Sequence, residues 1–165
     1  AVDVGYGQLD WKIRSSEKVK TVERTNLKIC EYSEIYQGNE PAADLLVSDL
    51  SFISLTKVLE NLKKLLNPDY HEMVCLIKPQ FEAGKEKVEK GGVVRSRQTH
   101  EEVIENVINF ARGLGYIIKG LTYSSIKGPS GNIEYLVWLE HGKDKTYEKI
   151  NIKSVVDEAF EKLNQ

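Results

Sequence analysis

The chain has 165 residues, which is long enough to bury a hydrophobic core without help from disulfides or metal ions. Its 41% of hydrophobic and 29% of charged residues are ordinary for a globular domain, and no apolar run approaches the ~18 residues of a membrane span. The formal net charge of -2 excludes a protein that is basic over its whole surface, although a local basic patch that faces nucleic acid remains possible.

Cysteine and histidine usage predicts neither a disulfide scaffold nor a metal site. Cys30 and Cys75 are too few for a scaffold, and Cys75 lies in an apolar run that is typical of a core position. The histidines, His71, His100 and His141, are scattered, without a partner at metal-ligand spacing. We therefore predict no metal and a reducing, cytoplasmic location. No basic segment followed by a long apolar one opens the chain, so we also expect no signal peptide.

Short apolar runs alternate with amphipathic segments, which predicts an α/β fold with helices on both faces of a mostly parallel sheet. The first strand ends at Asp3, so the chain starts within a strand. A short helix is expected over residues 9–14 and a weak strand over residues 19–22. A stronger strand is expected over residues 43–49, because a continuous apolar run is typical of a strand buried on both faces.

The middle of the chain is predicted as a helix, a strand and a long loop. Ser54 can cap the helix, whose leucines and Val58 fall on one stripe before Pro68 stops it. A strand over residues 73–77 then ends on Lys78. Residues 81–97 form a charged loop that contains glycine and shows no usable periodicity, and loops of this length are usually functional or mobile.

The last third of the chain is predicted as helix, strand, strand and helix. Residues 99–102 resemble a capping box that opens a helix, which ends near Gly113. Strands over residues 116–123 and 133–139 should pair antiparallel, because their connection is too short for a crossover helix. Residues 140–149 are interpreted as a charged linker. The final helix has an apolar face made of Ile152, Val155, Val156, Ala159, Phe160 and Leu163.

Polar side chains collect where the predicted strands end. Asp3, Asp49 and Lys78 each follow an apolar run, and Glu134 stands at the start of the last strand, which begins at that same edge if it runs antiparallel. Open α/β sheets bind ligands outside the carboxyl ends of their parallel strands. Each acid alone could merely cap a helix, and a lysine could be half of an ion pair. Their shared placement at one rim favours a functional site.

Five stretches of the sequence closely resemble the TlyA (hemolysin A) family. They are "AVDVGYGQLDWKIR", "ERTN", "DLLVSDLSFISL", "IKPQFEAGKEKVEKGGVVR" and "IKGPSGNIEYL", and the resemblance reaches nearly to Glu140. It implies an FtsJ-like, S-adenosylmethionine-dependent 2'-O-methyltransferase that acts on ribosomal RNA or ribosomal subunits. It also implies a Rossmann-like class I methyltransferase sheet. Residues 1–141 would form this domain, and residues 142–165 a linker and an amphipathic helix packed on it.

The resemblance implies roles for single residues. Asp49, Lys78 and Glu134 match the aspartate, second lysine and glutamate of the family's catalytic set. Asp3 matches the position that holds the ribose hydroxyls of the methyl donor, and Asn26 matches, more loosely, the position that contacts its adenine. Asp49 is also expected on the donor side of the site.

Three family features are expected before Ala1 and are not in this sequence. They are a glycine-rich first motif, the first catalytic lysine and a small N-terminal RNA-binding domain. The first strand is expected at the centre of the sheet, between the strands that end at Asp3 and Asp49, and its removal would expose two strand edges. We therefore expect the parent protein to be longer.

Methylation of a ribose 2'-hydroxyl needs a general base, and a lysine with an ordinary pKa of about 10.4 is protonated at neutral pH. Burial at the end of an apolar strand would lower the pKa of Lys78, whereas neighbouring carboxylates would raise it. Our hypothesis is that Lys78 is the base and that Asp49 and Glu134 position it and the ribose.

Residues 81–97 are either a solvated charged loop or an RNA-facing lid. The second reading predicts RNA contacts for Lys90 and Arg95, and Lys127 is a further candidate. Two alternatives to an enzyme remain, a non-catalytic RNA-binding module that retains the fold and a hemolysin-like module. The sequence offers neither a membrane span nor a strongly basic amphipathic helix in favour of membrane lysis.

Overall fold

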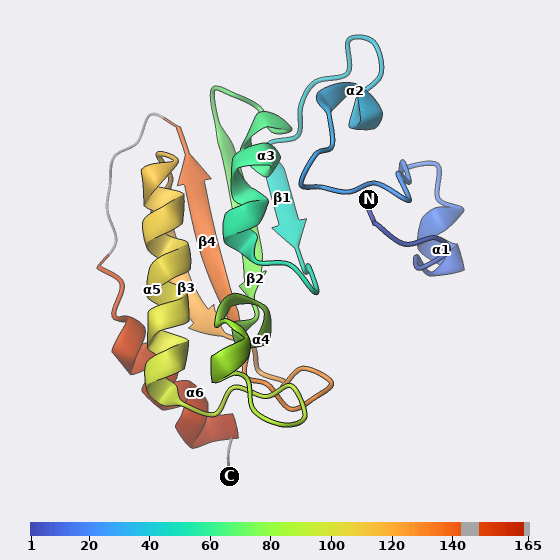
Figure 1. The fold of residues 1–165 in the computed structure, drawn as a ribbon. Coiled ribbons are helices and arrows are strands. Elements are labelled where there is room, and N and C mark those ends of the chain that lie inside the picture. The colour runs from blue at the N-terminus through green and yellow to red at the C-terminus, as the bar shows by residue number, and fades with distance from the viewer. Residues whose placement is uncertain (143–148, 164–165) are drawn as a thin grey trace.

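A four-stranded sheet forms the centre of the computed structural model, which describes residues 1–142 and 149–163. The strands are β1 (Leu45–Ser48), β2 (His71–Ile77), β3 (Ile117–Tyr123) and β4 (Tyr135–His141), and their order in the sheet is β1-β2-β4-β3 (Figure 1). β1 and β2 are parallel, and β4 runs antiparallel to both of its neighbours. The α/β class and the antiparallel last strand are confirmed.

Three helices cover one side of this sheet. α3 (Leu59–Lys64) and α5 (Arg97–Gly113) lie against the same face in Figure 1, and α6 (Ile152–Leu163) packs against α5 and β3. The side chains of Met73, Cys75 and Ile77 on that face are fully buried, whereas the residues that alternate with them in β2 are only half-buried. Among the described residues, the expected helical cover of the opposite face is not seen.

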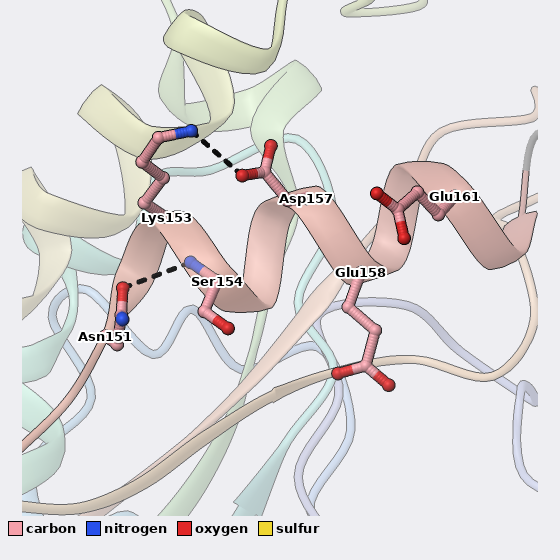
Figure 2. Close-up of a pocket in the computed structure, with 6 residues that line it drawn as sticks. All are labelled: Asn151, Lys153, Ser154, Asp157, Glu158 and Glu161. Atoms are coloured by element: carbon pink, nitrogen blue, oxygen red, sulfur yellow. Dashed lines mark hydrogen bonds and ion pairs between the residues drawn. The ribbon is translucent and has the colours of Figure 1, made fainter.

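The final helix was predicted correctly, and its outer surface carries a shallow hollow of about 520 Å³ (Figure 2). All the residues that line the hollow come from α6 or the residue before it, and Lys153 Nζ pairs with Asp157 Oδ2 at 2.9 Å beside it. The linker expected over residues 140–149 begins later than predicted, because β4 continues to His141, and residues 143–148 lie outside the described residues.

Two predicted helix starts are corrected. The N-cap of α5 is Ser96, whose hydroxyl accepts a hydrogen bond from the Thr99 N–H at 3.2 Å, so the expected capping box over residues 99–102 lies inside the helix. Ser54 does act as a cap, but of a single 3-10 turn, η1 (Leu55–Lys57), and α3 begins only after it. The first error concerns which of several polar residues closes the first turn, which local pattern alone leaves ambiguous. The second concerns where the α-helix starts, since the predicted cap is the observed one.

Residues 1–40 lie beside β1 and add no strand to the sheet (Figure 1). α1 (Trp11–Arg14) confirms the short helix, whereas α2 (Tyr32–Ile35) was not predicted. The strands expected to end at Asp3 and to span residues 19–22 are reduced to one parallel bridge between Val2 and Val22. The physical reason is that a two-stranded ladder without a further neighbour is marginal in water.

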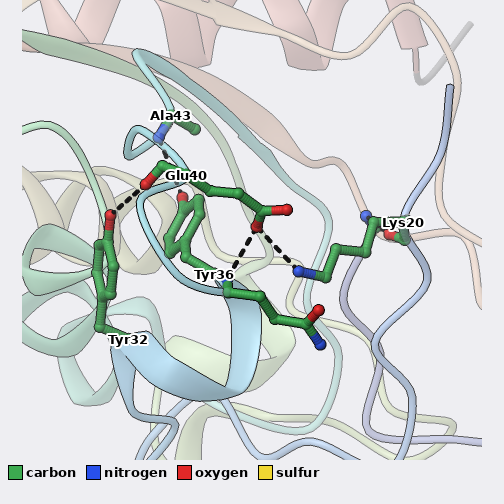
Figure 3. A network of polar contacts seen from close by, with 7 residues as sticks. Lys20, Tyr32, Tyr36, Glu40 and Ala43 are labelled. Carbon is green, nitrogen blue, oxygen red and sulfur yellow. Dashed lines mark hydrogen bonds and ion pairs between the residues drawn. The ribbon is translucent and has the colours of Figure 1, made fainter.

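A network of polar contacts ties this segment to the start of β1 (Figure 3). Lys20 Nζ lies 3.0 Å from Glu40 Oε2, and the Tyr32 hydroxyl donates to the Glu40 carbonyl at 3.1 Å. The Ala43 N–H donates to the Tyr36 hydroxyl at 3.1 Å. These contacts fix the approach of the chain to β1 and carry no chemistry of their own.

β1 is an edge strand and is not buried on both faces as expected. Leu45 is 57% exposed and Val47 is 76% exposed. β1 pairs with β2 on one side, and no described residue pairs with its other edge. An apolar run indicates that a strand favours burial, but it does not show which segment would cover the strand.

The loop expected over residues 81–97 is more ordered than predicted. It contains the second half of α4 (Pro79–Glu82), the 3-10 turn η2 (Lys85–Lys87) and a bridge between Glu89 and Val93. Gly91 and Gly92 form the turn of that bridge, with φ values of 96° and 78° that favour glycine. Lys90 therefore stands at the tip of a small hairpin.

Candidate active site

The parallel pairing of β1 and β2 brings their carboxyl ends to the same edge of the sheet. Asp49 directly follows β1, and Lys78 directly follows β2. Lys78 Nζ lies 2.6 Å from Asp49 Oδ1 and donates a hydrogen bond to Ser51 Oγ at 3.0 Å. The structure thus joins two of the residues that the sequence predicted to meet, and it adds Ser51 as a third.

Lys78 and Asp49 differ sharply in exposure. The Lys78 side chain is 12% exposed and that of Asp49 is 72% exposed. The lysine stem therefore lies along the protein while its charged end reaches a carboxylate on the solvent side. Asp49 and Ser51 take two of the three donor positions of the ammonium group, so one position remains for another acceptor.

Glu134 reaches the same edge from β4. Ile77 pairs with Tyr135 in the antiparallel register, so the next position outward sets Lys78 opposite Glu134. Glu134 is 6% exposed, and its Oε1 accepts a hydrogen bond from Gln80 Nε2 at 3.0 Å. No described lysine or arginine forms an ion pair with Glu134, so the hypothesised direct contact with Lys78 is not seen.

Two of the three residues predicted to bind the methyl donor, Asp3 and Asn26, lie in one turn system. The Gly5 N–H donates to Asp3 Oδ1 at 2.6 Å, and the Thr25 N–H donates to the Asp3 carbonyl at 3.0 Å. Asn26 follows directly, and its Oδ1 accepts a hydrogen bond from the Lys28 N–H at 3.0 Å. No hydrogen bond or ion pair between described residues links Asp3 or Asn26 to Lys78.

The two loops that carry the predicted RNA contacts lie side by side near the end of α4 (Figure 1). Asn132 joins them, because its Oδ1 accepts from the Val94 N–H at 3.0 Å and its Nδ2 donates to the Gly92 carbonyl at 2.8 Å. Lys90 and Lys127 are exposed. The exposed Arg95 pairs with Glu89 at 3.2 Å across the base of the hairpin, so part of its charge is already balanced.

Phe52 is a feature that sequence reasoning missed. Its side chain is 90% exposed, and its φ of 64° is uncommon and strained for a bulky residue. Its ring centroid lies 5.0 Å from that of Phe81, and it follows Ser51 directly. The site therefore presents an exposed aromatic ring, on a strained backbone, next to the residues that contact Lys78.

Ser51, Gln80 and Gly128 were also missed. Ser51 lies two residues after Asp49, Gln80 lies two residues after Lys78, and Gly128 lies in the stretch "IKGPSGNIEYL". These positions are the only signal that the sequence offered. Glu82, by contrast, supports the scaffold, since it accepts hydrogen bonds from the Ser54 hydroxyl and the Leu55 N–H. Burial raises the pKa of Glu82.

Other chemistry-bearing groups lie outside this edge. Cys75 is fully buried, as predicted, and burial raises its pKa to about 12, so its thiol is no nucleophile. Within residues 1–142 and 149–163, no three metal-ligating side chains converge, and no helix is long and apolar enough to cross a bilayer. The hollow on α6 is a surface depression lined by that helix and the residue before it.

Residues 1–141 match the FtsJ-like methyltransferase family. The chain belongs to that family. It is 41% identical over its whole length to a candidate rRNA methyltransferase, YqxC, of Bacillus subtilis and covers 59% of that protein. It is 39% identical over 97% of its length to the 16S/23S rRNA (cytidine-2'-O)-methyltransferase TlyA of Mycobacterium tuberculosis and covers 58% of it. The FtsJ-like chain thus spans about three fifths of the length of these curated relatives.

Two solved structures resemble this FtsJ-like domain closely. One is described as a candidate hemolysin from Streptococcus thermophilus, with a TM-score of 0.89 and 39% identity, and the match covers 99% of this chain and 58% of the other. The second is a candidate hemolysin from Lactococcus lactis, with a TM-score of 0.85 and 42% identity, over 95% of this chain and 74% of that one. The fold is therefore that of the FtsJ-like relatives named hemolysins.

Proposed function

We propose that the protein transfers a methyl group from S-adenosylmethionine to a ribose 2'-hydroxyl of ribosomal RNA. The observation that carries the proposal is the position of Lys78, a largely buried lysine held by Asp49 and Ser51 at the carboxyl edge of the sheet, with Glu134 opposite. Family membership supports the same reaction, as does the relative from Mycobacterium tuberculosis, which is named a 16S/23S rRNA (cytidine-2'-O)-methyltransferase.

The residues near the chain start fit the methyl donor in part. S-Adenosylmethionine supplies a methyl group on a positively charged sulfur when it is bound. Asp3 uses Oδ1 for the Gly5 N–H, which leaves Oδ2 as an acceptor for ribose hydroxyls. Asn26 uses only its Oδ1 locally, so its amide group is open to an adenine edge. Asp49 would complete the donor side from the end of β1.

Lys78 is the proposed proton acceptor. A 2'-hydroxyl must lose its proton as its oxygen attacks, and a neutral amine has one lone pair and two N–H groups. Asp49 Oδ1 and Ser51 Oγ take the two N–H groups, which directs the lone pair to the remaining position, where the hydroxyl would bind. Glu134, buried at the opposite strand position, would accept a hydrogen bond from the ribose and orient it.

The proposed RNA surface surrounds this edge. Lys90 at the hairpin tip, Arg95 at its base and Lys127 in the neighbouring loop would contact phosphates. Phe52 exposes an aromatic face next to Ser51, and unstacked bases bind to such faces. Cations and one ring beside a buried lysine support an RNA substrate over a small-molecule one.

The deciding experiment uses the natural full-length protein, labelled S-adenosylmethionine and ribosomal subunits. Lys78→Ala should abolish methyl transfer and leave donor affinity, measured by calorimetry, within about twofold. Lys64→Ala is the matched control, because Lys64 is an exposed lysine paired with Glu60 at 3.1 Å. Retained turnover in Lys78→Ala would contradict the proposed base. A wild-type protein that binds RNA without methylating it would instead favour the non-catalytic module.

A further inference from the structure

Glu134 has a fixed backbone and a side chain that must be held separately. It stands directly before β4, and its carbonyl accepts a hydrogen bond from the Ser124 N–H at 2.8 Å. The carboxylate lies at the end of several rotatable bonds, and no described cation pairs with it. Something other than an ion pair must therefore select its orientation.

Gln80 supplies one restraint. Its Nε2 donates to Glu134 Oε1 at 3.0 Å, from a position two residues after Lys78 and 54 residues away along the chain. A carboxylate oxygen is an acceptor, so the nitrogen end of the amide must face it. Gln80 thereby links the segment that carries Lys78 to the strand that carries Glu134.

Gly128 supplies the second restraint, from the loop between β3 and β4. A Cβ atom at this position would lie 2.6 Å from Glu134 Oε1 and 3.1 Å from its Cδ, well inside van der Waals contact. The φ of Gly128 is not in the left-handed region, so the backbone itself would accept alanine. Glycine leaves this space to the carboxylate, and an added Cβ would push the flexible end of Glu134 out of its position.

We propose that Gln80 and Gly128 are positioning residues that together set the orientation of the Glu134 carboxylate for methyl transfer. Both restraints act on the same oxygen, Oε1, and they leave Oε2 for the substrate. The inference rests on the proposed function, because it assigns these residues to a step in which Glu134 orients the ribose.

The other atom of the Gln80 amide is an acceptor that a substrate could use. Gln80 Oε1 is buried and has no hydrogen-bond partner among the described residues. A buried carbonyl without a donor is unfavourable, and native structures contain few of them. A substrate that binds beside Glu134 could donate a hydrogen bond to this oxygen.

The test compares Gln80→Met, Gly128→Ala and the double variant in the full-length protein. Gln80→Met keeps a long side chain and removes the donor, and Gly128→Ala displaces the carboxylate. Each should lower the single-turnover rate of methyl transfer at saturating RNA and donor roughly 10- to 100-fold, as a misplaced catalytic group does, with unchanged donor affinity. Because both act on one oxygen, the double variant should lose less than the product of the single losses.

Two matched controls should react at the wild-type rate. Gln98→Met removes a bond of the same kind, because Gln98 Nε2 donates to Glu102 Oε1 at 3.0 Å on the exposed side of α5. Gly113→Ala adds a Cβ where no atom lies within 4 Å. Wild-type rates in Gln80→Met and Gly128→Ala would overturn the positioning role alone. The positioning role would also be overturned if the rate loss of the double variant equalled the product of the two single losses and the variants unfolded at a lower midpoint than the wild type. A wild-type protein without methyl transfer would overturn the proposed function and this inference together.

Discussion

His100 makes the stability of the domain depend on pH in a direction that the structure fixes. It is fully buried, its Nε2 lies 2.9 Å from the Val94 carbonyl and its Nδ1 lies 2.8 Å from the Tyr135 hydroxyl. A carbonyl only accepts, so Nε2 carries a hydrogen, and in a neutral ring Nδ1 accepts from the tyrosine hydroxyl. Burial lowers the pKa of His100, with the hydrogen bond to Val94 acting in the opposite direction.

The size of the effect follows from proton linkage. The folded pKa of His100 lies below its unfolded value of ~6.5, so its contribution to stability is fully present above about pH 6.5 and is lost as the pH falls through the folded pKa. If the folded ring stays neutral one unit below the unfolded pKa, proton uptake by the unfolded chain costs about 1.4 kcal/mol. About 1.4 kcal/mol is therefore the largest loss of stability that one histidine can cause at that pH.

His100→Gln removes the titration but can still donate to the Val94 carbonyl. Urea unfolding of the wild type and the variant at about pH 7.5 and about pH 5.5, followed by circular dichroism, gives four free energies whose double difference isolates this residue. The variant should lose up to ~1.4 kcal/mol less than the wild type on acidification, even if it is less stable at both pH values. An equal loss in the two proteins would refute the assignment of a neutral, buried ring.

Three further predictions concern the site and its supports. Phe52→Gly should raise the free energy of unfolding by ~1 kcal/mol, because glycine tolerates a φ of 64°, and should lower RNA affinity in filter binding. Asn132→Ala should cost ~1–3 kcal/mol in urea unfolding, since it leaves the Val94 N–H and the Gly92 carbonyl without their partner. Lys90→Glu should weaken RNA binding and reduce the slope of log K against log salt by ~0.7 or more, and an unchanged slope would exclude a phosphate contact.

The sequence located the edge of the candidate site because two physical rules act over short distances. An apolar run followed by a charge marks a strand end, and parallel strands present their carboxyl ends together, so Asp49 and Lys78 were expected to meet and do. The antiparallel last strand followed from a short connection, which set Glu134 at that edge. The catalytic roles of Asp49, Lys78 and Glu134 stay predictions, as do the binding roles of Asp3, Asn26, Lys90, Arg95 and Lys127.

Only the tertiary structure shows which residues contact Lys78 and Glu134. Ser51, Gln80 and Gly128 act on Lys78 or Glu134 across 27, 54 and 6 residues of chain, through contacts that depend on side-chain torsions and on how segments pack. The same holds for β1, because its apolar sequence predicts burial on both faces, whereas Leu45 and Val47 are exposed. Periodicity and composition show which face of a segment is apolar and favours burial. Which other segment covers that face depends on how distant parts of the chain pack together. The sequence by itself therefore determined which residues follow the strands at this edge, and the fold determined which distant side chains hold them.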